Sequence, residues 1–167
     1  MSDLMSYMMK SSAGQILPAM AGTLKKAKAY AAEREIEESV LLSARLFPDM
    51  HPLLRQYQMA ADTVVRGAAR LGGMEMPSFP DSEGNIDELI ARLEAANAFV
   101  QSVDDAAIDA NAMQVLEIPL GPMTVNWEGR QYLSTFVLPN LHFHASIAFS
   151  LLRHQGVSIG KRDFLTA

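Results

Sequence analysis

Apolar residues recur every three or four positions along four long segments of the chain, and this spacing limits the possible folds more than any other feature. It places apolar side chains on one helix face, and it predicts helices over residues 13–32, 50–71, 86–100 and 130–154. Such helices bury their apolar faces against one another, which favours a four-helix bundle. At 167 residues the chain has the length of one domain, and we expect residues 1–167 to form a single one.

Capping residues and prolines refine the expected bounds of these helices. Asn85 is the expected N-cap of the third helix, and Glu88, three residues later, completes a capping-box pattern. Asp49 is the expected cap of the second helix. Pro18 and Pro139 lie inside the first and fourth segments, so each of these helices either begins near its proline or kinks there.

Between the third and fourth helical segments the pattern changes to short apolar runs. Residues 114–120 and 123–127 alternate with the period of two that is typical of strands, and Gly121-Pro122 between them suits a turn. We expect a small β-hairpin here, with a plain loop as the alternative. The predicted fold class is therefore all-α, a four-helix bundle with a small β-hairpin before the last helix.

Composition and charge exclude several classes of function. The chain has no cysteine, which excludes disulfides, thiolate metal ligands and a cysteine nucleophile, and which suits a cytoplasmic location. Its net charge of −5 gives little attraction to a phosphate backbone, so we expect no nucleic-acid partner. No apolar stretch approaches the roughly 18 residues of a membrane span, and the first residues lack the order of a signal peptide. We therefore expect no membrane partner.

Two pairs of polar residues lie on faces of the predicted helices. Asn140 and His144 are four apart in the fourth helix, and Gln58 and Asp62 are four apart in the second. Each pair therefore shares one helix face. If both faces point inward, the four side chains meet in the core, where bundle proteins build their ligand and metal sites. Alternatively, His144 is a core histidine that is hydrogen-bonded by Asn140 or Gln58.

Long parts of the sequence resemble a known family. The segments are FPDMHPLLRQYQMAADTVVRGAARLGG, PSFPDSE and GRQYLSTFVLPNLHFHASIAFSLLRHQGVSIGKRDF. They are similar to an uncharacterised bacterial family of domains of unknown function within the DinB-like (DinB/YfiT) superfamily. The resemblance implies a four-helix bundle with up-down-down-up connectivity, often dimeric. It also implies kinship with metal-dependent hydrolases and thiol transferases, which hold a metal with one histidine of helix two and a His-x-x-x-His pair of helix four.

The metal-binding pattern implied by this resemblance is only partly present. His144 falls at the second histidine of the helix-four pair, Asn140 stands at the first, and the helix-two position is near Gln58 or Asp62. A catalytic metal site needs about three protein ligands, and amides are weak ligands for first-row metals. His144 is therefore the one clear candidate ligand, and we expect as cofactor either a divalent metal, nickel or zinc, or none.

Two functions follow from these residues. The one we favour is a small-molecule binding domain whose inward-facing polar site consists of Gln58, Asp62, Asn140 and His144. The alternative is an enzyme of the hydrolase or thiol-transferase kind that uses a divalent cation at His144. Whether the chain is an enzyme depends on which of the two is correct.

We also expect a homodimer. The fourth helix carries two apolar stripes, and one of them can face the bundle core. The second stripe, formed by Ala145, Phe149 and Leu152, needs cover from another part of the chain or from a second subunit.

Overall fold

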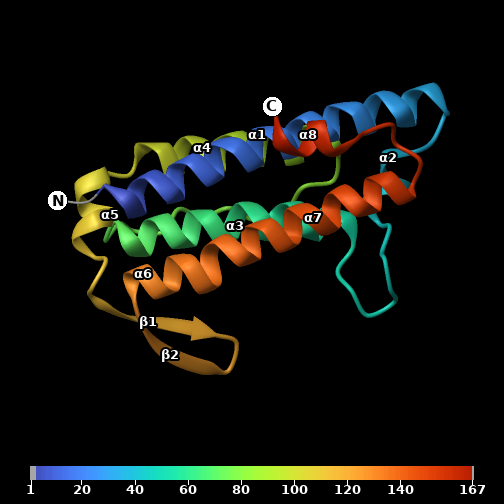
Figure 1. Cartoon of the computed structure of the whole chain (residues 1–167). Helices are drawn as coiled ribbons and strands as arrows, with labels where there is room; N and C mark the ends of the chain where they lie inside the picture. Colours follow the sequence, from blue (N-terminus) through green and yellow to red (C-terminus); the bar gives the residue numbers. More distant parts are fainter. Residues whose placement is uncertain (1–2, 167) are drawn as a thin grey trace.

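The structure, a computed structural model, describes residues 3–166 of the chain. Four long helices lie side by side along most of the molecule (Figure 1): α1 (Leu4–Glu33), α3 (Leu53–Leu71), α4 (Ile86–Ser102) and α7 (Leu138–His154). Shorter helices connect or follow them: α2 (Glu38–Leu42), α5 (Asp105–Ala110), α6 (Gly129–Tyr132) and α8 (Lys161–Leu165). Two antiparallel strands complete the fold: β1 (Val115–Leu120) and β2 (Met123–Glu128). The predicted fold class, a four-helix bundle with a hairpin before the last helix, is confirmed.

Helices α1 and α7 run in one direction, and α3 and α4 run in the opposite one (Figure 1). Hydrogen bonds place the two ends of α4: Ile86 N, at its start, donates to Glu38 of α2, and Gln101, near its end, donates to the carbonyl of Lys10 in α1. The connectivity is therefore up-down-down-up, as the family resemblance implies. Because α3 and α4 are parallel, the connection 72–85 has to run back along the bundle.

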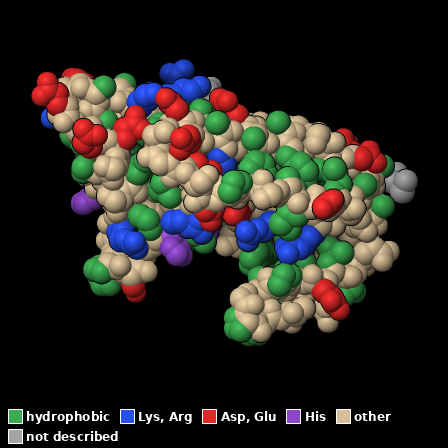
Figure 2. Space-filling view, turned by 180° about the vertical axis from the view of Figure 1, so that it is seen from behind, with side chains coloured by type: hydrophobic (Ala, Val, Ile, Leu, Met, Phe, Trp, Pro, Cys, Tyr) green, Lys and Arg blue, Asp and Glu red, His purple; other side chains and the backbone are tan. Residues whose placement is uncertain are grey.

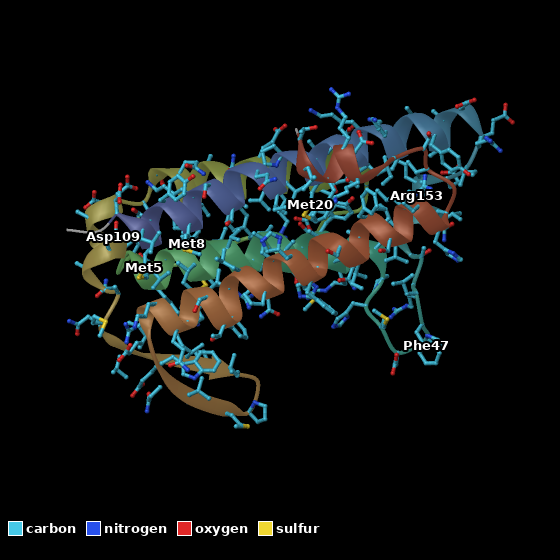
Figure 3. All side chains as sticks on the ribbon, viewed as in Figure 1. Met5, Met8, Met20, Phe47, Asp109 and Arg153 are labelled. Carbon is cyan, nitrogen blue, oxygen red and sulfur yellow. The ribbon has the colours of Figure 1, made fainter. Side chains whose placement is uncertain are left out.

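The first helix is longer than predicted. It begins at Leu4 and continues through Pro18, so the helix does not start at the proline. Its extra turns bury Met5 and Met9 in the bundle core. The Asp109 carboxylate of α5 accepts hydrogen bonds from the first backbone N–H groups of α1 and lies beside its start (Figure 3). A residue far along the chain thus caps this helix, which local sequence patterns do not reveal.

The capping predictions for the next two long helices have opposite outcomes. Asp49 does not cap α3, because the helix begins later, after Pro52, whose extended backbone forms the N-cap. Asn85 does cap α4, and its side chain accepts the backbone N–H of Glu88 over 3.0 Å. The Glu88 carboxylate accepts from the N–H of Gly84 instead of completing a capping box with Asn85.

The predicted fourth helix is a continuous helical run from Gly129 to His154. It comprises α6, a π-helical turn (Leu133–Val137) and α7. Pro139 is the second residue of α7 and lies in its first turn, after the π-helical turn. A proline has no N–H to donate to the preceding turn, and the carbonyl that would accept it, that of Thr135, belongs to the π-helical turn.

By length and composition, Gly129–His154 is the one helix in the described residues that could cross a membrane. In the fold it packs along α3 and α1. The apolar residues that α7 buries there fill the bundle core: Leu141, Ala145, Ala148, Leu151 and Leu152. The polar His144 is buried on the same helix. An apolar core helix passes the same test of length and composition, and we interpret Gly129–His154 in this way.

The second apolar stripe of α7 is covered by the chain itself. Ala145 and Leu152 are buried, and the ring of Phe149 packs edge to face on Phe164 of α8, with 5.8 Å between the ring centroids. The stripe therefore gives no argument for a second subunit. The homodimer stays a prediction from the family resemblance, which light scattering at micromolar concentration can test.

Two projections extend from the same side of the bundle (Figure 1). One is the hairpin, which is anchored by the fully buried Ile118 and by Trp127, whose ring lies 6.1 Å from that of Phe136. The other is the segment 43–52 between α2 and α3, with the exposed Phe47 at its tip (Figure 3). Between the two projections, the surface of the bundle is formed by the neighbouring helices α3 and α7.

Candidate functional site

A groove of about 560 Å³ lies between α3 and α7. On the α7 side its wall is a stripe of residues that are four positions apart: Tyr132, Phe136, Asn140 and His144. On the α3 side the wall is a second stripe: Arg55, Met59, Asp62, Thr63, Arg66 and Arg70. Residues at such spacings share a helix face, so the two stripes face each other. We call this space the α3–α7 groove.

The hairpin and the connection 72–85 complete the α3–α7 groove. Pro119 of β1 lines it at one end, and Met76 and Asp81 of the connection line its edge. Seen from behind, the molecule is hollowed between the hairpin and the segment 43–52, with basic and histidine side chains bordering the hollow (Figure 2). The groove brings together three of the four predicted site residues, namely Asp62, Asn140 and His144. Gln58 does not line it.

His144 is positioned by a residue that the sequence analysis did not select. Its Nδ1 lies 2.9 Å from Oε1 of Gln56 on α3. The amide nitrogen of Gln56 donates to the carbonyl of His51, which leaves its oxygen to face the imidazole ring. Nδ1 therefore carries the proton, and Nε2 keeps its lone pair. None of the described residues donates a hydrogen bond to Nε2, so this atom is available to a molecule in the groove.

Electrostatics keep the imidazole of His144 neutral. The side chain is 6% exposed, and this burial lowers its pKa below the ordinary value of 6.5. The electrostatic effect of His51 lowers the pKa of His144 further. At pH 7 His144 is therefore a hydrogen-bond acceptor at the groove wall, and it carries no positive charge.

The other predicted pair, Gln58 and Asp62, belongs to a different cluster, which is centred on Arg92 of α4. The Arg92 side chain is 2% exposed, and its Nη2 lies 2.5 Å from Asp62 Oδ1 and 3.0 Å from Asp81 Oδ1. Its Nη1 lies 2.7 Å from Glu83 Oε1. Gln58 donates to the same Glu83 carboxylate. We call these residues the Arg92 cluster, and they tie the connection 72–85 to the bundle.

The Arg92 cluster keeps the carboxylates of Asp81 and Glu83 ionised. Burial alone would raise the pKa of Glu83, but the hydrogen bonds from Arg92 and Gln58 outweigh it, and the pKa lies below the ordinary value. The pKa of Asp81 is also lowered, because Arg55 and Arg92 together outweigh its desolvation. The negative charges beside the groove are thus already neutralised by arginines.

The residues of the α3–α7 groove do not fit the metal site that the superfamily resemblance implies. Within residues 3–166, no three His, Asp or Glu side chains come together in a way that could hold a metal ion. Asp62 is bound by Arg92 and Arg66. Asn140 donates its amide N–H to the carbonyl of Phe136. One imidazole nitrogen, Nε2 of His144, is the remaining strong donor for a metal.

Comparisons with known proteins agree with this fold. Residues 8–165 match the family model described as "Domain of unknown function (DUF1993)". The crystal structure of a DinB family member protein from Shewanella denitrificans superposes with a TM-score of 0.86 at 32% sequence identity. That match covers 99% of this chain and 91% of the other. No curated protein matches the chain.

Proposed function

The chain belongs to the DUF1993 family, whose function is unknown, and has the fold of a DinB family member; we propose that it binds a small organic molecule in the α3–α7 groove without a metal. One observation carries this proposal. The groove joins Asn140 and a neutral His144 to five apolar side chains, while the two acidic residues that line it, Asp62 and Asp81, are already paired with arginines.

The size of the groove supports a small-molecule ligand. Its volume of about 560 Å³ lies within the roughly 300–1,000 Å³ of typical ligand pockets. Its walls combine five apolar side chains with eight polar or charged ones, three of them arginines, so the groove is more polar than a typical ligand pocket. The apolar part is formed by Met59, Met76, Pro119, Tyr132 and Phe136.

The polar residues have separate tasks in this proposal. His144 accepts a hydrogen bond from the ligand through Nε2, because its Nδ1 proton is held by Gln56. Asn140 offers the oxygen of its amide and one N–H, since its other N–H is donated to the carbonyl of Phe136. Asp62 and Gln58 act indirectly, because they hold Arg92 and Arg55 in place.

The alternative, a metal-dependent hydrolase or thiol transferase, requires about three metal ligands. His144 would have to recruit two further donors. Its contacts are the amide of Gln56 and the ring of Phe143, and the carboxylate of Asp62 in the same groove is bound by arginines. The imidazole of His51, whose electrostatic effect lowers the pKa of His144, is one further donor, and within the described residues no group of three metal ligands results. The geometry therefore favours the binding function over the enzyme.

A variant that fills the groove tests the proposal. Thr63 lies on the groove wall, and Thr63→Trp should displace any organic molecule that is retained by the protein isolated without a histidine tag. Ser150→Trp, at an exposed position of α7 outside the groove, is the matched control. Native mass spectrometry, followed by denaturing extraction, should detect the retained molecule in the native protein and in the control, but not in Thr63→Trp. Equal small-molecule content in all three proteins would contradict the proposal.

A further inference from the structure

We propose that the molecule bound in the α3–α7 groove is an elongated organic anion, whose carboxylate or phosphate head is bound by Arg66 and Arg70 at the hairpin end. This inference rests on the proposed function and adds the chemical class of the ligand. It starts from the pairing of the arginines that line the groove.

Arg70 has no carboxylate partner among the described residues. Its Nη1 donates to the hydroxyl of Tyr132 over 3.1 Å, and its guanidinium lies 6.0 Å from the centre of the same ring. Both contacts orient the guanidinium and leave its charge uncompensated. A half-buried arginine that is held in this way presents its remaining N–H groups to the groove.

Arg66 is only weakly compensated. Its partner Asp62 lies 3.2 Å away, and the other oxygen of that carboxylate is bound by Arg92 over 2.5 Å. Arg66 and Arg70 are four residues apart on α3, and like charges at this spacing repel each other. The chain as a whole is acidic, with a net charge of −5. Two neighbouring and poorly paired arginines therefore make this part of the groove positive in an otherwise acidic protein.

The charges around the groove give a net positive balance. The four arginines at positions 55, 66, 70 and 92 face three carboxylates, those of Asp62, Asp81 and Glu83. His144 adds no charge, because its pKa is lowered by burial. The excess charge lies at the hairpin end, since the acidic residues gather around Arg92 and Arg55. Planar guanidinium groups bind carboxylate and phosphate oxygens with paired hydrogen bonds.

The length of the groove sets the shape of the anion. His144 is twelve residues after Tyr132 on the same helical run, which corresponds to roughly 18 Å at a rise of ~1.5 Å per residue. Phe136 and Met59 lie between the two ends. A ligand that reaches both Arg70 and His144 therefore has an apolar body between an anionic head and a polar tail. Inorganic phosphate could occupy only the arginine end.

The single tryptophan of the chain provides a direct readout. Trp127 packs on Phe136, which lines the groove, with 6.1 Å between the ring centroids. Binding beside Phe136 should therefore change the fluorescence of Trp127. The probe is phenylbutyrate, and its uncharged amide, phenylbutyramide, is the matched neutral compound. Inorganic phosphate alone measures the affinity of the head group without an apolar body.

We expect phenylbutyrate to change the Trp127 fluorescence saturably and to bind at least tenfold more tightly than phenylbutyramide or inorganic phosphate. Arg70→Gln and Arg66→Gln should each lower the affinity for phenylbutyrate by about tenfold or more, because hydrogen bonds to charged groups are lost. Arg70→Lys should retain part of the affinity. Arg153→Gln is the control, since Arg153 donates to the carbonyl of Ile159 outside the groove.

Three results of the fluorescence experiment would overturn the inference. The first is equal binding of the acid and its amide, the second is native affinity in both Arg→Gln variants, and the third is the absence of any binding of phenylbutyrate. The proposed function is decided separately by Thr63→Trp. If this variant loses a retained molecule that is uncharged, the groove binds a ligand, but the ligand is not an anion.

Discussion

Gln56 and His144 face each other across the interface of α3 and α7, with Gln56 Oε1 2.9 Å from His144 Nδ1. Both side chains are buried, with exposed fractions of 2% and 6%. The glutamine also donates to the carbonyl of His51, so that a single side chain sets both the orientation and the tautomer of the imidazole. His144 consequently presents an acceptor, Nε2, to the α3–α7 groove.

Removal of His144 should destabilise the protein. His144→Ala leaves the buried Gln56 oxygen without a partner, and an unpaired buried polar group costs about 1–3 kcal/mol. His154→Ala should cost far less, because His154 is exposed at the end of α7. Urea unfolding of both variants measures the difference. Equal free energies of unfolding would show that His144 contributes no buried hydrogen bond.

The pair itself can be tested with a double-mutant cycle. Once Gln56 has been replaced by alanine, His144→Ala should cost less than it does in the native protein, because the shared hydrogen bond has already been lost. The coupling between the two changes should be larger than that between His144→Ala and Gln58→Ala. Additive effects of Gln56→Ala and His144→Ala would contradict the assigned contact.

Stability should fall in acid partly because of His144. Its pKa in the folded protein lies below the ordinary value of 6.5, as a result of burial and then of the electrostatic effect of His51. The unfolded chain therefore binds the proton first, and stability is lost as the pH falls below about 6.5 toward the folded pKa. His144→Gln should show a smaller loss over this range in urea unfolding. An unchanged pH dependence in His144→Gln would contradict the lowered pKa.

Replacement of Arg92 should have the largest effect on stability. Arg92→Met removes the cation that pairs with Asp62, Asp81 and Glu83. Breaking a buried ion pair by removing one partner costs about 3–5 kcal/mol. The connection 72–85 should also detach from the bundle and become sensitive to proteolysis. Arg130→Met is the control, because the Arg130 side chain is 60% exposed and pairs with Glu128 at the surface. Equal stability of the two variants would contradict the role of Arg92.

The overall fold could be predicted from the sequence because its signals are local. Apolar spacing gave four helices, the alternating runs between Gln114 and Trp127 gave the hairpin, and Asn85 marked the start of α4. The start of α1 was placed too late because it depends on Asp109, which is close only in the folded chain. The predicted cap at Asp49 is wrong because α3 begins later, at Leu53, with Pro52 as its N-cap.

The candidate site could be predicted only in part. Helical spacing placed Asn140 and His144 on one face, and the structure puts both at the groove with Asp62. The partner of His144 is Gln56 and not Gln58, and spacing within one helix cannot select between two glutamines without the relative rotation of the helices. The predicted contact of Gln58 with His144 is therefore replaced by its contacts with Arg55 and Glu83.

The sequence analysis did not select Arg92 or the groove arginines as site residues, because charged residues on a helix are usually exposed to solvent. A signal for Arg92 was present, since it lies beside Leu89 and Leu93 on the apolar face of its helix and follows an acidic loop with Asp81 and Glu83. The remaining arginines, at positions 55, 66 and 70, recur along α3 on the same stripe as Asp62. A search for arginines on helix faces that also carry apolar residues would have found all four.

The most direct test of a metal-free site is the nitrogen NMR spectrum of the histidine side chains, with His144→Gln used to assign the signals of His144. At neutral pH we predict a protonated Nδ1 and an unprotonated Nε2 in His144. The chemical shifts of both nitrogens should stay the same after one equivalent of zinc has been added. A zinc-induced shift of the Nε2 signal, together with stoichiometric zinc retained after dialysis, would contradict the proposed function and support the metal-dependent alternative.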